Sequence, residues 1–167
     1  MNFHLPFPFA LFPFPFHNTM STPIPVRVLH PHGEPPTGLP IVELPMSAVD
    51  RRRVRRLVEA PDGVVFALEL PTGTVLHPGQ LLHHDAEAAY VVSAADEDVL
   101  VVHPRDLAEA ARIGHLIGNM HRDLHAAGTE IVALADDVLA DRLGRFGATF
   151  DRARRPFHGR APGEHSH

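Results

Sequence analysis

The chain of 167 residues contains no cysteine, no tryptophan and no lysine. Without cysteine it forms neither disulfide bonds nor thiolate metal sites, so nitrogen and oxygen atoms are the strong ligands left for a metal ion. All 15 basic residues are arginines and the formal net charge is −5, which argues against a general basic surface for nucleic acid or anionic membranes. No apolar run is long enough to span a bilayer. We therefore expect neither nucleic acid nor a membrane as a partner.

Histidine is the unusual component of the composition, with 14 residues. Its imidazole is a common metal ligand near neutral pH, so the histidines, rather than carboxylates or thiols, are the first candidates for chemistry. The hydrophobic content of 44% is sufficient for the core of one ordinary domain or of two small ones.

The first 20 residues alternate phenylalanine with proline and hold six of the ten phenylalanines. Proline at every second or third position prevents a regular helix or a central strand. A signal peptide is also disfavoured, because the segment lacks a positive start and a small-residue cleavage site. We predict a disordered extension over residues 1–20 and hypothesise that Met20 is the true translation start, which the intact mass of the native protein tests.

Residues 21–99 show short β-like segments separated by turns. The clearest are 41–44 and 64–70, followed by 80–82 and 89–92, and Gly-containing turns punctuate the series. This spacing predicts a small β-sandwich or barrel. The arginine run 51–56 is flanked by Asp50 and Glu59, which predicts a solvated strand or turn edge.

Residues 100–156 predict a β-α-β-β-α-β domain of the ferredoxin-like class, so the whole chain is of the α+β class. A buried strand at 99–102 precedes the first helix, return strands follow, and Asp136 and Gly147 are suited to begin and end the second helix. The expected apolar stripes are Leu107, Ala110, Ile113, Gly114 and Ile117 on the first helix and Val138, Leu139, Leu143 and Phe146 on the second.

His121 is the leading candidate ligand. Gly118 and Asn119 tolerate a left-handed cap, so they should end the first helix and leave His121 on a rigid mount. Beyond it, His121, Asp123 and His125 alternate as on one strand face, which makes His125 a secondary candidate. His115 precedes His121 by six residues, which places it on another helix face. Residues 157–167 lack a core pattern and predict a flexible tail.

The sequence resembles the UreE family of urease accessory proteins, the nickel metallochaperones. The resemblance rests on motifs in order through most of the chain after Met20: Leu-Pro-x-Gly-Thr-Val-Leu at 70–76, Gly-x-Leu-Leu at 79–82, Gly-Asn-x-His at 118–121, Asp-x-Val-Leu at 136–139, Leu143, Gly147 and Pro-Phe at 156–157. The Gly-Asn-x-His motif is the most characteristic of them.

The resemblance implies a cytoplasmic, non-enzymatic nickel carrier that forms a homodimer through its C-terminal domains. The histidine that matches His121 would come from each subunit, with His165, His167 and His158 of the tail as further ligands and His125 and His115 as lesser candidates. Ni²⁺ is the expected metal, Zn²⁺ and Cu²⁺ should also bind, and the implied partners are the urease accessory GTPase and the urease apoprotein complex. The β-rich domain would be a partner- or peptide-binding module.

The chain departs from the family pattern at three places. Met120 stands where the family usually has arginine between Asn and His. Residues 135–137 read Ala-Asp-Asp where some members have His-Asp-His, so we expect that auxiliary site to be missing. The tail is short, which argues against bulk metal storage.

Two other function classes stay open from the residues. A histidine-ligated metal could activate water in a hydrolase, but the sequence has no HExxH motif or comparable spacing. Ferredoxin-like sheets also bind RNA, but the C-terminal strands lack the aromatic pairs on which bases stack.

Overall fold

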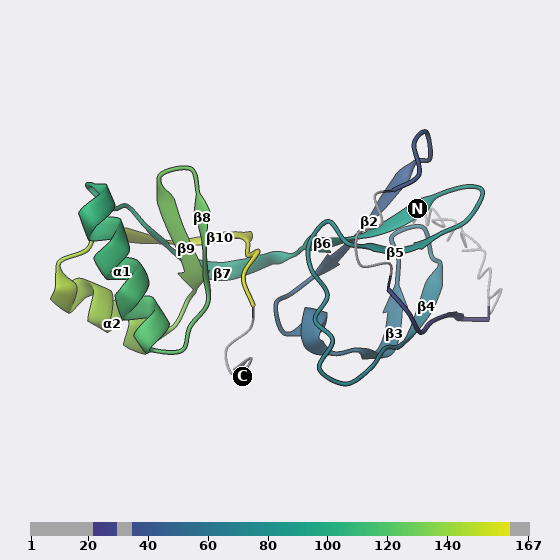
Figure 1. Cartoon of the computed structure of the whole chain (residues 1–167), viewed down its shortest axis with the longest axis horizontal. Helices are drawn as coiled ribbons and strands as arrows, with labels where there is room; N and C mark the ends of the chain where they lie inside the picture. Colours follow the sequence, from purple (N-terminus) through teal and green to yellow (C-terminus); the bar gives the residue numbers. More distant parts are fainter. Residues whose placement is uncertain (1–21, 30–34, 161–167) are drawn as a thin grey trace, which may run out of the picture.

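A computed structural model describes residues 22–29 and 35–160 of the chain. They form two lobes placed end to end, an N-terminal lobe of strands and a C-terminal lobe of strands and helices (Figure 1). The predictions for residues 1–20 and for His165 and His167 lie outside the described residues. None of the helices in the described part has the length and apolar character that crossing a bilayer requires.

The N-terminal lobe consists of two three-stranded sheets. One has the order β1-β4-β3 and the other the order β2-β6-β5. The strands are β1 (Ile24–Val26), β2 (Ile41–Met46), β3 (Arg55–Glu59), β4 (Val65–Glu69), β5 (Leu81–His84) and β6 (Ala89–Ala94), with a short 3-10 helix, η1 (Asp50–Arg52), between β2 and β3.

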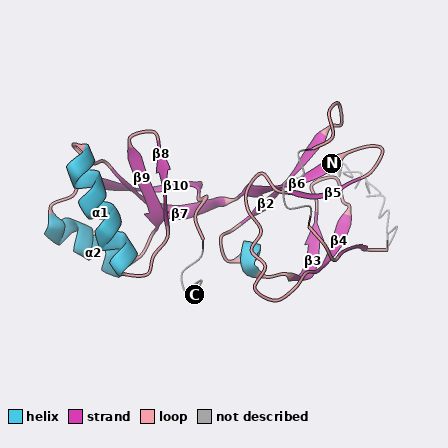
Figure 2. Cartoon of the chain, in the orientation of Figure 1, coloured by secondary structure: helices cyan, strands magenta, loops and turns pink. Residues whose placement is uncertain are grey.

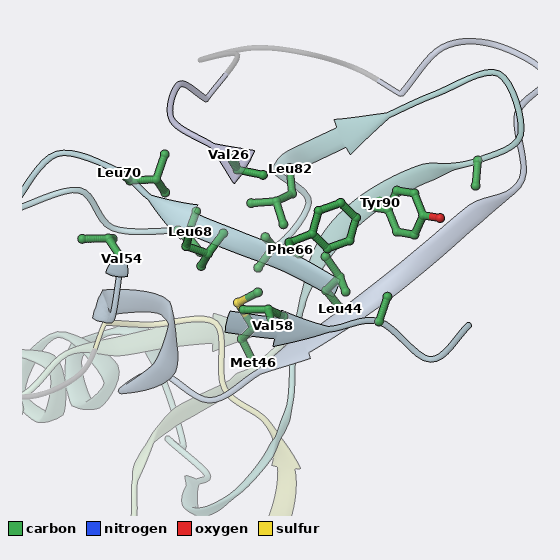
Figure 3. Close-up of a cluster of buried hydrophobic side chains, with 14 residues drawn as sticks. Val26, Leu44, Met46, Val54, Val58, Phe66, Leu68, Leu70, Leu82 and Tyr90 are labelled. Carbon is green, nitrogen blue, oxygen red and sulfur yellow. The ribbon is translucent and has the colours of Figure 1, made fainter. Parts of the chain in front are cut away.

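One core joins the two sheets (Figure 3). Along β4, Phe66 and Leu68 are buried while their neighbours are not, so one face of the strand points inward, as the period of two requires. The ring of Phe66 lies 4.8 Å from that of Tyr90 in an edge-on arrangement, and the Tyr90 hydroxyl donates a hydrogen bond of 3.0 Å to Asp62. Of the two predicted forms, a small sandwich or a barrel, the N-terminal lobe adopts the sandwich.

The C-terminal lobe is one antiparallel sheet with two helices. It is built from β7 (Asp96–Val102), α1 (Leu107–Asn119), β8 (Leu124–Ala127), β9 (Glu130–Leu134), α2 (Asp137–Phe146) and β10 (Phe150–Pro156). The sheet order is β10-β7-β9-β8, and both helices lie on the same side of it (Figure 2). This confirms the predicted ferredoxin-like β-α-β-β-α-β class.

The helices begin and pack as their sequences require. Asp106 and Asp136 are the N-caps, whose carboxylates accept hydrogen bonds from the backbone N–H of Glu109 and Leu139. The buried helix side chains pack against apolar residues of β7 and β9, and the cluster includes Ile113, Ile117, Leu139, Leu143, Leu100, Val102, Ile131 and Ala133.

Three residues of the predicted helix stripes were assigned wrongly. Leu107, Val138 and Phe146 are 87%, 60% and 38% exposed. Leu107 and Val138 lie in the first turns of their helices, and Phe146 is the last residue of α2. Leu139, next to Val138 in the same first turn, is fully buried, so an apolar residue near a helix end is buried only where it faces the sheet.

The opposite face of the sheet is where the two lobes meet. Val99, Val101 and Val132 pack there with Ala48 of the N-terminal lobe and with Phe157, which follows β10. The strands β6 and β7 are separated by a single residue, Ala95. The lobes are therefore joined by a shared apolar cluster as well as by the chain.

The arginine run is not a continuous solvated edge. Arg51 is 1% exposed, whereas Arg52, Arg53 and Arg55 are exposed as predicted. The burial of Arg51 removes one of the five arginines of the run from the exposed surface.

Candidate metal site

His121 directly follows Met120, the C-cap of helix α1. The backbone N–H of His121 donates to the carbonyl of Gly118 at 2.9 Å, and that of Arg122 donates to Ile117 at 3.3 Å. This pair of bonds is a Schellman motif, in which the residue after the cap adopts the left-handed conformation. Here that residue is His121, with φ of 53°.

The sequence prediction placed the left-handed residue wrongly. Gly118 and Asn119 were expected to supply it, but both belong to α1, and among the described residues other than glycine only His121 has a positive φ. Glycine usually occupies this position because a side chain strains the left-handed backbone. The histidine at this position is therefore unusual, and the backbone hydrogen bonds of residues 121 and 122 fix the direction in which its Cα–Cβ bond points.

The loop after His121 is tied to helix α2. The Arg122 guanidinium donates to the Asp136 carboxylate at 2.8 Å, and the other oxygen of Asp136 accepts from the Leu139 N–H at 2.9 Å. The N-cap of α2 therefore also holds the loop that carries His121.

The chain after β10 returns along the start of β8. Phe157 lies with its ring 5.5 Å from that of His125, the N–H of His158 is 3.4 Å from Nδ1 of His125, and the N–H of Arg160 donates to the Asp123 carboxylate. The contacts proceed from His125 to Asp123, so the segment runs toward His121 and its last described residue, Arg160, lies beside the same loop.

The described residues bring together only some of the predicted ligands. The rings of His125 and His158 are 5.1 Å apart, whereas no group of three or more histidines, aspartates or glutamates converges as a metal cage in the described ranges. The alternation of His121 with His125 was wrong, because β8 begins only at Leu124. His125 instead lies on the sheet face away from the helices.

His125 has a structural role in this arrangement. Burial lowers its pKa, helped by the nearby charges of His158 and Arg155 and opposed by Asp123. The neutral ring suits a ligand, but its Nδ1 faces the N–H of His158 and therefore acts as the acceptor. The remaining ring nitrogen then carries the proton, so His125 binds a metal only after this contact is given up.

His115 lies on α1, apart from the other predicted ligands. Its Nε2 accepts a hydrogen bond of 2.9 Å from the Asn119 amide, and it lines a groove of about 570 Å³ on the outer side of α1 and α2. The other lining residues are Ala111, Arg112, Leu116, Asn119, Met120, Arg142 and Phe146. Met120, which departs from the family pattern, packs against the helical core.

Sequence reasoning missed two residues that shape this region. Asp123 holds the backbone of Arg160, and Arg51 of the N-terminal lobe donates to carbonyls of Phe157 and Gly159. Neither has a local sequence signal, because each acts on residues far away along the chain.

Both parts of the chain are similar to proteins of one known family. Residues 26–95 match the N-terminal domain and residues 97–167 the C-terminal domain of the family described as UreE urease accessory protein. Similar proteins named urease accessory protein UreE occur in Synechococcus sp. (48% identical over 132 residues, 79% of this chain and 89% of the relative) and in Deinococcus radiodurans (52% over 126 residues, 75% and 81%). A third, from Paraburkholderia xenovorans, is 37% identical over 121 residues, 71% of this chain and 54% of the relative. All are named as accessory proteins rather than enzymes, which confirms the prediction of a non-enzymatic protein and leaves the hydrolase alternative unsupported.

Proposed function

The chain belongs to the UreE family of urease accessory proteins, and from this premise we propose that it carries Ni²⁺ to urease during assembly of the urease active site. The metal is cargo, held between two copies of the chain and then handed on. His121 is the central ligand from each copy.

The proposal rests mainly on the fixed backbone conformation of His121. Its backbone is held in the left-handed conformation at the end of α1, and the last described residue, Arg160, is bound to Asp123, two positions further along the loop. The described chain that precedes the predicted ligands His165 and His167 therefore ends beside the loop that carries His121. A fixed imidazole and a tail that starts beside it suit a carrier that has to release its ion.

The number of ligands favours two copies. Ni²⁺ takes roughly four to six nitrogen or oxygen ligands, and a single chain offers one fixed histidine at this place. In an isologous pair each copy contributes the same residue, so His121 supplies two ligands and the tails and water complete the shell. The groove lined by Leu116, Met120 and Phe146 gives the copies an apolar contact surface beside His121. His158, His125 and His115 are lesser candidates.

Binding should depend on pH and should not be exclusive to nickel. Histidine binds metal only when neutral, so affinity falls as pH drops through about 6.5. Zn²⁺ and Cu²⁺ compete, because the affinity of nitrogen ligands follows the Irving–Williams order. Selectivity then comes from metal supply and from recognition of the partners, the urease accessory GTPase and the urease apoprotein complex, in the cytoplasm. We assign partner recognition to the β-rich domain of residues 21–99 and metal binding to residues 100–156 with the tail.

Nickel titration calorimetry at neutral pH, with native mass spectrometry in parallel, tests the proposal. The samples are the full chain, His121→Ala, a chain that ends at Arg160, and His77→Ala as a control at an exposed histidine of the other lobe. We expect one ion per two chains, loss of tight binding in His121→Ala, weaker binding without the tail and no change in the control. Unchanged stoichiometry and affinity in His121→Ala would refute the proposal.

A further inference from the structure

We propose that Arg51, a residue of the N-terminal lobe, is a positioning residue for the tail: it fixes residues 157–159 and thereby keeps the tail histidines close to His121. This inference rests on the proposed nickel site and adds a residue from the other domain to it.

The first observation is the set of bonds that Arg51 makes. Its Nη2 donates to the carbonyls of Phe157 and Gly159, both at 2.8 Å, and its Nη1 lies 3.5 Å from the carbonyl of His158. Three successive carbonyls after β10 thus face one guanidinium. The planar group presents its donors in a fixed fork, so it sets the direction of the backbone as well as holding it.

The second observation is that Arg51 is itself held firmly. Its backbone N–H donates to Ser47 at 3.0 Å and its carbonyl accepts from Leu76 at 2.9 Å. In the same turn the N–H of Ala48 donates to the Glu97 carboxylate at 2.8 Å. Arg51 as a whole is 1% exposed. Burial raises the pKa of the Glu97 carboxyl, and the charge of Arg51 acts in the opposite direction. The N-terminal lobe therefore offers a rigid anchor at the junction.

The third observation is that residues 157–160 are also held by contacts other than those with Arg51. The Phe157 side chain is fully buried in the cluster on the sheet face away from the helices. A Cβ added to Gly159 would lie 2.4 Å from the Phe157 ring, so only glycine fits there. Arg160 is then bound to Asp123. Residues 157–160 are fixed by three separate elements, and Arg51 supplies the contact from the other lobe.

The number of residues between the fixed segment and His165 determines how strongly its release should affect nickel binding. From Arg160, His165 is five residues away and reaches at most roughly 18 Å. If the segment were released, the tail would start after Pro156, nine residues before His165. Effective concentration in a flexible chain falls roughly as the −3/2 power of length, so release should weaken tail-dependent nickel affinity by about two- to threefold. The loss of direction adds to this.

The structural half of the inference is tested without metal. Since the chain has no cysteine, Ser166→Cys provides a single site for a nitroxide label, whose broadening of the amide signals of residues 121–125 measures how close the tail lies. We expect strong broadening in the parent and in Arg53→Met, an exposed arginine control, and at least a halving in Arg51→Met. Arg51→Lys, which keeps a charged donor, should restore part of it. Equal broadening in Arg51→Met and Arg53→Met would overturn the inference.

A second variant guards against misfolding of Arg51→Met. Gly159→Ala displaces the same segment through the Phe157 ring and leaves Arg51 in place. It should reduce the broadening as Arg51→Met does. Full broadening in a folded Gly159→Ala protein would show that the position of residues 157–159 does not control the tail, which also overturns the inference.

Nickel titration separates this inference from the proposed function. Arg51→Met should weaken nickel binding by up to about two- to threefold in the full chain, the value for complete release of the segment, and have no effect in a chain ending at Arg160. An equal loss in both chains would mean that Arg51 acts only on the fold, and would overturn its positioning role. Absence of tight nickel binding in the parent protein would defeat the proposed function, while the broadening result would stand or fall by itself.

Discussion

Substitution of Phe157 by alanine probes the contact on which the tail segment and the lobe junction both depend. The ring is 0% exposed and lies among Val99, Val101 and Val132. Replacing a fully buried phenylalanine by alanine costs about 3–5 kcal/mol. Because Phe157 follows β10 and is not part of a strand, its segment can shift and fill part of the space that the ring leaves. We therefore expect a loss near the lower limit, about 3 kcal/mol.

Urea denaturation measures this loss with two probes that separate the domains. Both α-helices belong to the C-terminal lobe and the single tyrosine, Tyr90, to the N-terminal lobe, so circular dichroism at 222 nm and tyrosine fluorescence follow different lobes. With a slope of about 1–3 kcal/mol/M, a loss of 3 kcal/mol lowers the midpoint of the helix transition by at least about 1 M.

The control for Phe157→Ala is Leu107→Ala, which removes a side chain that is 87% exposed and should change stability by less than about 0.5 kcal/mol. If the midpoint of Phe157→Ala stays within the range of this control, Phe157 does not hold the segment to the sheet and the reasoning on the tail fails. A shift of the helix transition alone would locate the effect in the C-terminal lobe, and a shift of both transitions would indicate that Phe157 also stabilises the junction.

Three further predictions concern single groups. Burial, with a hydrogen bond to an aspartate, raises the pKa of Tyr90 to about 12. The buried neutral phenol therefore stabilises the fold fully below the unfolded pKa of about 10, and this contribution is lost as pH rises toward 12. A titration followed by absorbance at 295 nm should show a midpoint near 12 for the folded protein, and a midpoint near 10 would contradict this. The hydrogen bonds from the Arg105 side chain and backbone lower the pKa of Glu109 to about 2. The ionised Glu109 therefore stabilises the fold above its unfolded pKa, and this contribution to stability is lost as pH falls toward 2. The difference in urea midpoint between Glu109→Gln and the parent should narrow from pH 6 to pH 2.5, and a constant difference would refute the pairing with Arg105. Gly147 has φ of 81° and Gly144 lies in open space within α2, so Gly147→Ala should destabilise by about 1 kcal/mol while Gly144→Ala should stabilise by about 0.5–1 kcal/mol; urea midpoints that move in the same direction would contradict this.

The architecture was predictable because its signals are local. Asp136 and Gly147 mark the two ends of α2 by capping chemistry that depends on neighbouring residues alone. The apolar run 99–102 is buried because it forms the centre of the sheet, with neighbours on both sides. Such features follow from residue type and periodicity, and they were sufficient to give the order of elements in the C-terminal lobe.

The details of the site depend on tertiary contacts and were partly missed. Helix α1 continues through Gly118 although glycine disfavours a helix by about 1 kcal/mol, because Ile117 and Met120 pack into the helical core and hold this turn in place. The left-handed residue then falls on His121. Arg51 could not be identified by composition, because four of the other five residues in the run 51–56 are also arginines and only the fold distinguishes the buried one.

The bonds between Arg51 and residues 157–159 bear on how this protein can be divided or recombined. The single residue between β6 and β7 looks like a natural seam for exchanging halves between relatives. A chimera joined at Ala95 would nevertheless combine Arg51 from one parent with residues 157–159 from the other. Arg51 and residues 157–159 must therefore come from the same parent, and a C-terminal half made alone would lack the side chain that holds those carbonyls.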